Sequence, residues 1–193
     1  TCQKTGTFTQ NWNKIGTLGS TGGGGGGNTF NISGNGLYIS PDSCGAVKAN
    51  QTFAAAGYNQ TYIDANYPGI GAVTTDNIDW AAFQKAINIA AATGLPVWCY
   101  GNYYVNKPIT IAKTALNIVV YGNNCLISTT NSNRFSVFYR PTPTDNTEAN
   151  TMVESKYVFK NVNLSGSSTQ CGFDVGPGYG QWFEGCHLTG LAK

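Results

Sequence analysis

The hydrophobic and polar positions of residues 74–111 predict one helix followed by short strands. Apolar residues recur there at three- and four-residue spacing, as on one face of a helix: Trp80, Phe83, Ile87, Ala90 and Ala91. We expect Asp76 or Asp79 to accept hydrogen bonds from the free amides at the helix start. Gly94 and Pro96 predict its end, because glycine tolerates the left-handed conformation and proline cannot continue a helix.

Short runs of β-branched and aromatic residues, separated by glycine and asparagine, predict strands after this helix. We expect them at residues 96–100, 103–105, 109–111, 116–128 and 134–140, with a Gly-Asn-Asn turn dividing the fourth run. Before the helix, residues 29–40 predict a β-hairpin with its turn at Gly34-Asn35-Gly36. The stretch PTPTDNTEAN, residues 141–150, has the composition of an exposed loop.

Two segments near the end of the chain repeat at an offset of 24 residues, YVFKNVNLSG at 157–166 and QWFEGCHLTG at 181–190. The matched pairs include Phe159 with Phe183, Val162 with Cys186, Leu164 with Leu188 and Ser165 with Thr189. Such a period is typical of solenoids, in which equivalent residues of successive repeats become neighbours. Asn161 corresponds to Gly185, and both residue types tolerate left-handed backbone, so we expect a bend there.

The run IDWAAFQKAI, then AAATG, then LPVWCYGNYYVNKPITI resembles the N-terminal signature of the pectate-lyase superfamily. The upstream ANYPGIGAVTTDNID is similar to the lead-in of that family, without its second glycine. The resemblance extends from about Tyr62 onwards and implies a right-handed parallel β-helix. Together with the repeat, it predicts an all-β solenoid with an N-terminal capping α-helix. We expect a glycine-rich arm with a hairpin over residues 1–60, and the helix with the first coils over residues 61–193.

Charge and composition narrow the choice of partners. Charged residues make up 10% of the chain, against about a quarter in an average protein. A polar surface of uncharged residues suits an extracellular or virion protein better than a cytosolic enzyme. The net charge of +2 is spread without a basic stripe, so we expect no nucleic acid as partner. No apolar run is long enough to span a bilayer, so we expect no membrane insertion.

Six cysteines allow up to three disulfides. None has CxxC spacing and the chain has one histidine, which argues against a metal site built on cysteine and histidine. Cys2 and Cys44 lie in polar, irregular sequence and are the pair best suited to a disulfide in a secreted protein. The other four lie in apolar runs and are expected to be small buried hydrophobes: Cys99, Cys125, Cys171 and Cys186.

The pectate-lyase superfamily contains lyases, hydrolases, phage tailspikes and non-catalytic adhesins, so the resemblance implies a carbohydrate-directed protein. We expect part of a phage tailspike or fibre that binds, with or without degrading, a surface polysaccharide. Such a protein would be a homo-oligomer, a trimer in the case of a tailspike. A secreted microbial polysaccharide lyase or glycoside hydrolase is one alternative. A non-catalytic structural or adhesive filament subunit is the other.

Candidate site residues follow from the chemistry of these classes. Glycoside hydrolysis needs two carboxylates across the scissile bond, and Asp174 and Glu184 lie in the repeat region. Glu184 is also expected to form an ion pair with Lys160, its neighbour on the preceding repeat. Sugar rings stack on flat apolar faces, which makes candidates of three aromatic residues, with a histidine as hydrogen-bond donor: Tyr139, Tyr179, Trp182 and His187.

No cofactor is expected from the sequence. A lyase of this family would use calcium held by clustered aspartates, and that motif does not appear here. If the chain belongs to an enzyme, we therefore expect most of the catalytic site to lie outside this segment.

Overall fold

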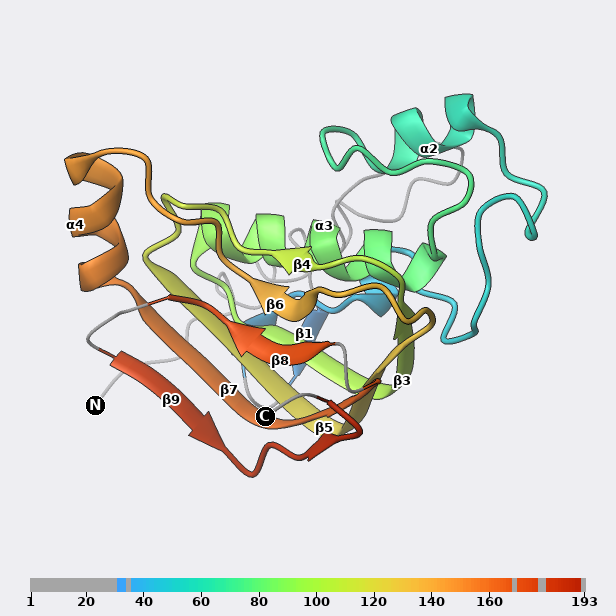
Figure 1. The fold of residues 1–193 in the computed structure, drawn as a ribbon. Helices are drawn as coiled ribbons and strands as arrows, with labels where there is room; N and C mark the ends of the chain where they lie inside the picture. Colours follow the sequence, from blue (N-terminus) through green and yellow to red (C-terminus); the bar gives the residue numbers. More distant parts are fainter. Residues whose placement is uncertain (1–30, 34–35, 168–169, 177–179, 192–193) are drawn as a thin grey trace, which may run out of the picture.

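The computed structural model describes residues 31–33, 36–167, 170–176 and 180–191 (Figure 1). Its helices are the 3-10 turn η1 (Asp42–Cys44), α2 (Gln60–Asn66), α3 (Ile78–Thr93) and α4 (Asn146–Glu154). Its strands are β1 (Asn31–Ser33), β2 (Gly36–Tyr38), β3 (Val97–Val105), β4 (Ile109–Thr110), β5 (Asn117–Thr129), β6 (Ser136–Tyr139), β7 (Lys156–Ser165), β8 (Cys171–Asp174), β9 (Gly180–Glu184) and β10 (Leu188–Thr189).

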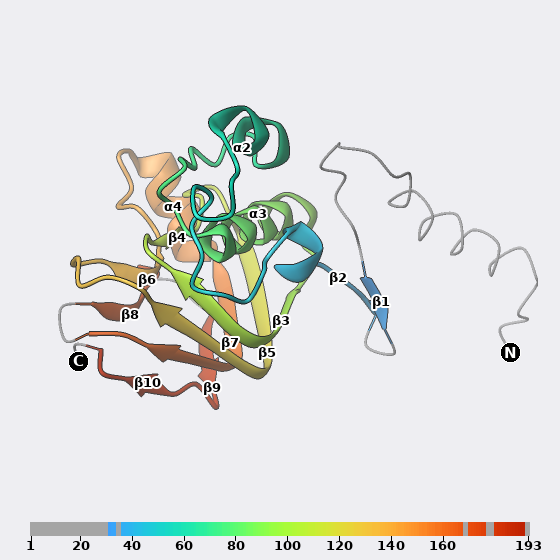
Figure 2. The same cartoon turned by 90° about the vertical axis from the view of Figure 1, so that its right-hand side faces the viewer.

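The strands form two parallel sheets and one hairpin. The larger sheet has the order β10-β7-β5-β3, with β9 also paired to β7, and the smaller has the order β4-β6-β8. Figure 2 shows these sheets on two sides of a shared core, with the antiparallel β1–β2 hairpin extending away from it. Phenylalanines from both sheets meet between them, since Phe138 of β6 lies 4.8 Å from Phe159 of β7 between ring centroids.

The prediction of an all-β solenoid is wrong, because the chain has a mixed α/β fold. Helix α3 is part of the core, and α2 and α4 form from polar sequence that carries little strand or helix periodicity. The predicted exposed loop at residues 141–150 is wrong in its second half, where α4 begins. Asp145 Oδ1 accepts a hydrogen bond from the Glu148 amide at 2.8 Å, and this contact supports the first turn of α4.

Helix α3 differs from the predicted amphipathic helix in how much of it is buried. Gln84, which is not part of the apolar face read from the sequence, is buried, and its side chain binds both backbone groups of Thr110 at 2.6 and 2.7 Å. The predicted end of the helix is confirmed by the left-handed Gly94 (φ 72°). The predicted caps are wrong, because Asn77 holds the N-cap position. The carboxylate of Asp76 binds the Val73 amide and Lys107 Nζ, and that of Asp79 binds amides of other segments.

Asp79 binds three backbone amides on two segments of the chain from inside the core. Its side chain is fully buried, and its oxygens accept hydrogen bonds from the amides of Val47 (2.7 Å), Lys48 (2.9 Å) and Tyr104 (3.1 Å). Burial raises the pKa of this carboxyl, whereas the three amide donors lower it. The carboxylate thus replaces, for these amides, the hydrogen bonds that water would supply.

We expect Asp79→Asn to lower the free energy of unfolding by about 1–3 kcal/mol. Asparagine keeps one acceptor oxygen for Val47 and Lys48, but its NH2 group then faces the Tyr104 amide, donor against donor. Chemical denaturation measures the effect, with Asp64→Asn on the exposed side of α2 as the matched control. Equal effects of the two substitutions would contradict this role for Asp79.

The strand register bears out the predicted repeat. Phe159 pairs with Phe183 and Leu164 with Leu188, on β7 against β9 and β10. The predicted bend is confirmed by the left-handed backbone of Asn161 (φ 56°) and Gly185 (φ 61°). On β5 the same conformation occurs at Asn124 (φ 52°), where the predicted turn is a bend inside one strand.

The first turn of α4 contains an acid-sensitive contact. Hydrogen bonds from the side chain and amide of Thr144, together with Lys113 at 3.0 Å, lower the pKa of Glu148 to about 2. A lowered pKa means that this contact stabilises the fold above about pH 4.5. That contribution is lost as the pH falls from about 4.5 towards about 2.

We expect Thr144→Ala to raise the pKa of Glu148, because it removes the hydroxyl that contributes most to the shift. Lys113→Met should raise it as well, because it removes a hydrogen bond and a nearby positive charge. An NMR titration of the Glu148 carboxyl in the three proteins measures both shifts. A wild-type pKa near the ordinary 4.5 would show that these contacts do not form in solution.

Candidate carbohydrate-binding surface

A row of large side chains crosses the outer face of the larger sheet. Trp98 on β3 pairs in register with Tyr121 on β5, and Tyr121 pairs with Lys160 on β7. Because side chains alternate along a strand, these residues point outward while their neighbours Val97 and Val120 are buried in the core. Parallel pairing therefore sets the outward residues of adjacent strands side by side.

Tyr38 extends this row beyond the edge of β3. The next residue, Ile39, forms a parallel bridge with Val97, which holds Tyr38 beside the sheet. The ring of Tyr38 lies 5.9 Å from that of Trp98, and the ring of Trp98 lies 5.6 Å from that of Tyr121, between centroids. We call Tyr38, Trp98 and Tyr121 the aromatic stripe.

The aromatic stripe borders a hollow of about 500 Å³. The hollow is lined by Tyr38, Pro96, Trp98, Tyr121, Gly122, Asn123, Lys160 and Asn161. Asn123 and Asn161 are exposed, so their amide groups are free to donate and accept hydrogen bonds at the rim. Apolar walls with a few polar groups are typical of sites that bind small molecules or single units of a polymer.

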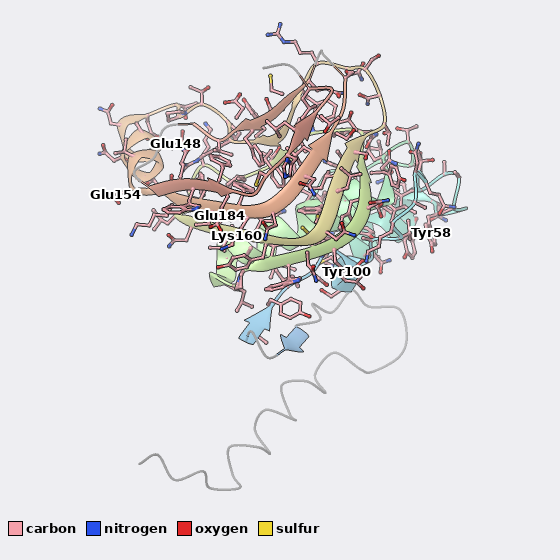
Figure 3. The ribbon with its side chains drawn as sticks, turned by 90° about the horizontal axis from the view of Figure 1, so that it is seen from below. Tyr58, Tyr100, Glu148, Glu154, Lys160 and Glu184 are labelled. Atoms are coloured by element: carbon pink, nitrogen blue, oxygen red, sulfur yellow. The ribbon has the colours of Figure 1, made fainter. Side chains whose placement is uncertain are left out.

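The predicted ion pair between Lys160 and Glu184 is confirmed, with 2.9 Å between Nζ and Oε1 (Figure 3). Their hydrogen bond raises the pKa of Lys160 and lowers the pKa of Glu184. Both side chains are well exposed, so water and salt screen the pair and it adds little to stability. Its position at the edge of the hollow makes it a charged group that a ligand would meet.

The carbohydrate-binding residues predicted from the sequence lie on separate elements of the fold. Tyr139 lies on β6 of the smaller sheet, whereas Trp182 lies on β9 of the larger sheet and is 61% exposed. The indole of Trp182 donates to Glu184 Oε2 at 3.3 Å. His187 is exposed between β9 and β10, and Tyr179 lies outside the described residues. The structure brings Trp182 and Glu184 together, but places Tyr139 in the other sheet.

The two candidate catalytic carboxylates do not line a common hollow. Asp174, at the end of β8, lines a second hollow of about 600 Å³ together with Phe173, Phe183 and Leu188. Glu184 follows Phe183 on β9 and therefore points to the opposite face of the strand. An inverting or retaining pair of carboxylates must face one another across a substrate, which this arrangement does not provide.

Sequence reasoning missed the aromatic stripe, although each of its strands was predicted. The signal present in the sequence was the pair of aromatic residues at outward positions, Trp98 and Tyr121, in two runs expected to be strands. Tyr38 was equally visible in the predicted hairpin. Only the pairing of the strands shows that the three rings are neighbours.

Other kinds of site find no support in the described part of the chain. Its histidine, cysteine, aspartate and glutamate side chains form no group of three or more that could hold a metal ion. None of the helices among residues 36–167 is long and apolar enough to cross a membrane. Comparison with known proteins finds no matching family model, curated protein or solved structure.

Proposed function

We propose that this chain binds a polysaccharide across the aromatic stripe. The observation that carries the proposal is the row of three neighbouring rings beside a hollow with two exposed asparagine amides. Sugar rings offer apolar C–H faces to aromatic side chains and hydroxyl groups to amides. The stripe and the rim of the hollow provide both kinds of contact at one place.

The spacing of the rings favours a polymer over a single sugar. Adjacent rings lie 5.6 and 5.9 Å apart because they project from neighbouring strands, and the row spans three of them. A chain laid across the strands would contact successive rings. Lys160 and Glu184 are paired with each other, so the hollow adds no net charge, which favours a neutral polysaccharide.

The biological setting is a further part of the proposal. A place in a phage tailspike or fibre, with a trimeric assembly on the virion, is supported by the sequence resemblance to the pectate-lyase superfamily and by the low content of charged residues. This tailspike or fibre setting, with its trimeric assembly, stays a prediction. Binding at the aromatic stripe does not depend on it, because the stripe is present in the single chain.

Affinity electrophoresis through gels containing neutral or acidic bacterial polysaccharides tests the proposed function. We expect at least one neutral polysaccharide to retard the protein without becoming shorter. Shortening of the polymer by a small amount of protein would instead favour the lyase or hydrolase alternative. Unchanged mobility in every gel would contradict polysaccharide binding and leave the filament subunit as the remaining hypothesis.

A further inference from the structure

A second row of outward side chains lies beside the aromatic stripe on the larger sheet. Tyr100 follows Trp98 by two residues on β3, and both side chains point outward because Cys99 between them is buried. The register pairs Tyr100 with Asn123 on β5, and Asn123 lines the hollow beside the stripe. Tyr100 is 52% exposed, so part of its ring is open to a ligand.

Lys48 holds the exposed ring of Tyr100 in place. Its Nζ lies 3.1 Å from the centroid of that ring, in a cation–π contact that covers one face of the tyrosine. The same ammonium group forms an ion pair with Asp42, with 3.1 Å between Nζ and Oδ1. Asp42 Oδ2 in turn accepts a hydrogen bond at 3.1 Å from the hydroxyl of the buried Tyr103. A ring fixed in this way has little conformational freedom to lose when a ligand binds.

The backbone that bears Lys48 is anchored in the core. Lys48 has the left-handed conformation (φ 55°), and its amide donates to the buried carboxylate of Asp79 at 2.9 Å. Cys44, at the end of η1, is buried in the same core. The disulfide predicted between Cys44 and Cys2 stays a prediction, because Cys2 lies outside the described residues. The position of Lys48 over Tyr100 therefore rests on contacts with buried groups.

The second row lies to one side of the path that the aromatic stripe offers to a polymer. The stripe crosses the strands, whereas Tyr100 is displaced from Trp98 along β3, by about 7 Å at about 3.3 Å per residue. A main chain that follows the stripe from Tyr38 to Tyr121 therefore passes beside Tyr100 without covering it. A sugar attached sideways to the unit over Trp98 would reach the ring of Tyr100 and the amide of Asn123.

We propose that Tyr100 binds a branch of the polysaccharide, so that the preferred ligand is a branched neutral polymer. The inference rests on the proposed function, because it concerns the same surface. Tyr100 supplies an apolar face for the branch sugar, and Asn123 supplies an amide for its hydroxyl groups. Lys48 is a positioning residue that holds the ring. Because Lys48 is paired with Asp42, the two add no net charge to the surface.

Affinity electrophoresis with matched polymers tests the proposal. The probes are the neutral bacterial polysaccharides, galactomannan and arabinoxylan, each before and after partial removal of its branches with a glycosidase. We expect a branched polymer to retard the wild-type protein more strongly than its trimmed form does. Tyr100→Ala should bind the branched form about tenfold more weakly, as expected for the loss of one stacking ring, and the trimmed form as well as the wild type does.

Two further variants separate this role from general effects of substitution. Lys48→Met removes the ammonium group and keeps an apolar stem. It should weaken binding of the branched form in the wild-type protein and have no effect when added to Tyr100→Ala. Tyr58→Ala removes an exposed tyrosine that stacks on Tyr62 of α2, apart from Tyr100 (Figure 3), and should leave binding of both forms unchanged.

The outcomes distinguish this inference from the proposed function. Equal retardation of the wild-type protein by branched and trimmed polymers would overturn the inference and leave polysaccharide binding intact. An unchanged preference for the branched form in Tyr100→Ala, or equal weakening of both forms, would do the same. Unchanged mobility of the wild-type protein in every gel would contradict both.

Discussion

Replacing Trp98 by alanine is expected to weaken polysaccharide binding by about tenfold or more. Trp98 is the middle ring of the aromatic stripe, within 6 Å of both of its neighbours between centroids. Removal of one aromatic ring that stacks on a ligand costs about 1–3 kcal/mol in the comparable case of nucleic-acid bases, and about 1.4 kcal/mol corresponds to a tenfold change in affinity. Isothermal titration with the polysaccharide that retards the protein measures the change.

Three further variants make this prediction specific. Tyr121→Ala should also weaken binding, because it removes the next ring of the stripe. Trp182→Ala removes a more exposed tryptophan from the same sheet and should leave the affinity unchanged. Trp98→Phe, which keeps an aromatic face, should retain most of the affinity. Loss of binding in Trp182→Ala with normal binding in Trp98→Ala would contradict polysaccharide binding at the aromatic stripe. It would favour Trp182, which was predicted from the sequence, as the binding residue.

Replacing Gly122 by alanine is expected to lower the free energy of unfolding by about 3 kcal/mol or more, at the upper end of the cost of overpacking. A Cβ at this position would lie 2.1 Å from the carbonyl oxygen of Asn161 and 2.7 Å from its carbonyl carbon. Both are backbone atoms of the paired strand β7, so they cannot move aside without disturbing the pairing of β5 with β7. Urea denaturation at constant pH measures the effect.

Gly94→Ala is the matched control for this steric effect. Gly94 has a left-handed backbone (φ 72°), but a Cβ there would meet no atom within 4 Å. Its replacement should therefore cost only the backbone strain, about 1–2 kcal/mol. A cost at Gly122 no greater than that at Gly94 would show that β5 and β7 do not approach one another as the register requires.

Local signals in the sequence predicted several elements correctly. Gly94 marks the end of α3 because a left-handed residue is required there, and the 24-residue repeat gave the pairing of β7 with β9. The ion pair of Lys160 with Glu184 followed directly from that repeat. Each of these predictions depends on neighbours in the chain or on one constant offset.

The features that the sequence did not reveal depend on tertiary contacts. The mixed α/β class was missed because α4 forms from a polar stretch, where the contacts of Asp145 and Glu148 at its start outweigh a loop-like composition. The role of Asp79 was missed because its amide partners lie on distant segments of the chain. From the sequence alone, a carboxylate near a helix start can either cap the helix or accept hydrogen bonds from the amides of another loop.

The aromatic stripe escaped prediction for a related reason. Trp98, Tyr121 and Lys160 are separated by unequal lengths of chain, because β6 and α4 lie between β5 and β7. No constant period links the three residues, so the repeat does not place them side by side. The pairing of their strands was needed to bring them into one row.

Footprinting of aromatic side chains tests polysaccharide binding at the stripe most directly. Hydroxyl radicals modify exposed rings, and mass spectrometry compares the modification of each ring with and without the bound polysaccharide. The aromatic stripe predicts protection of Tyr38, Trp98 and Tyr121, with unchanged modification of Tyr58 and Trp182. Protection of Trp182 with no protection of Trp98, under conditions where the polysaccharide is bound, would contradict binding at the aromatic stripe.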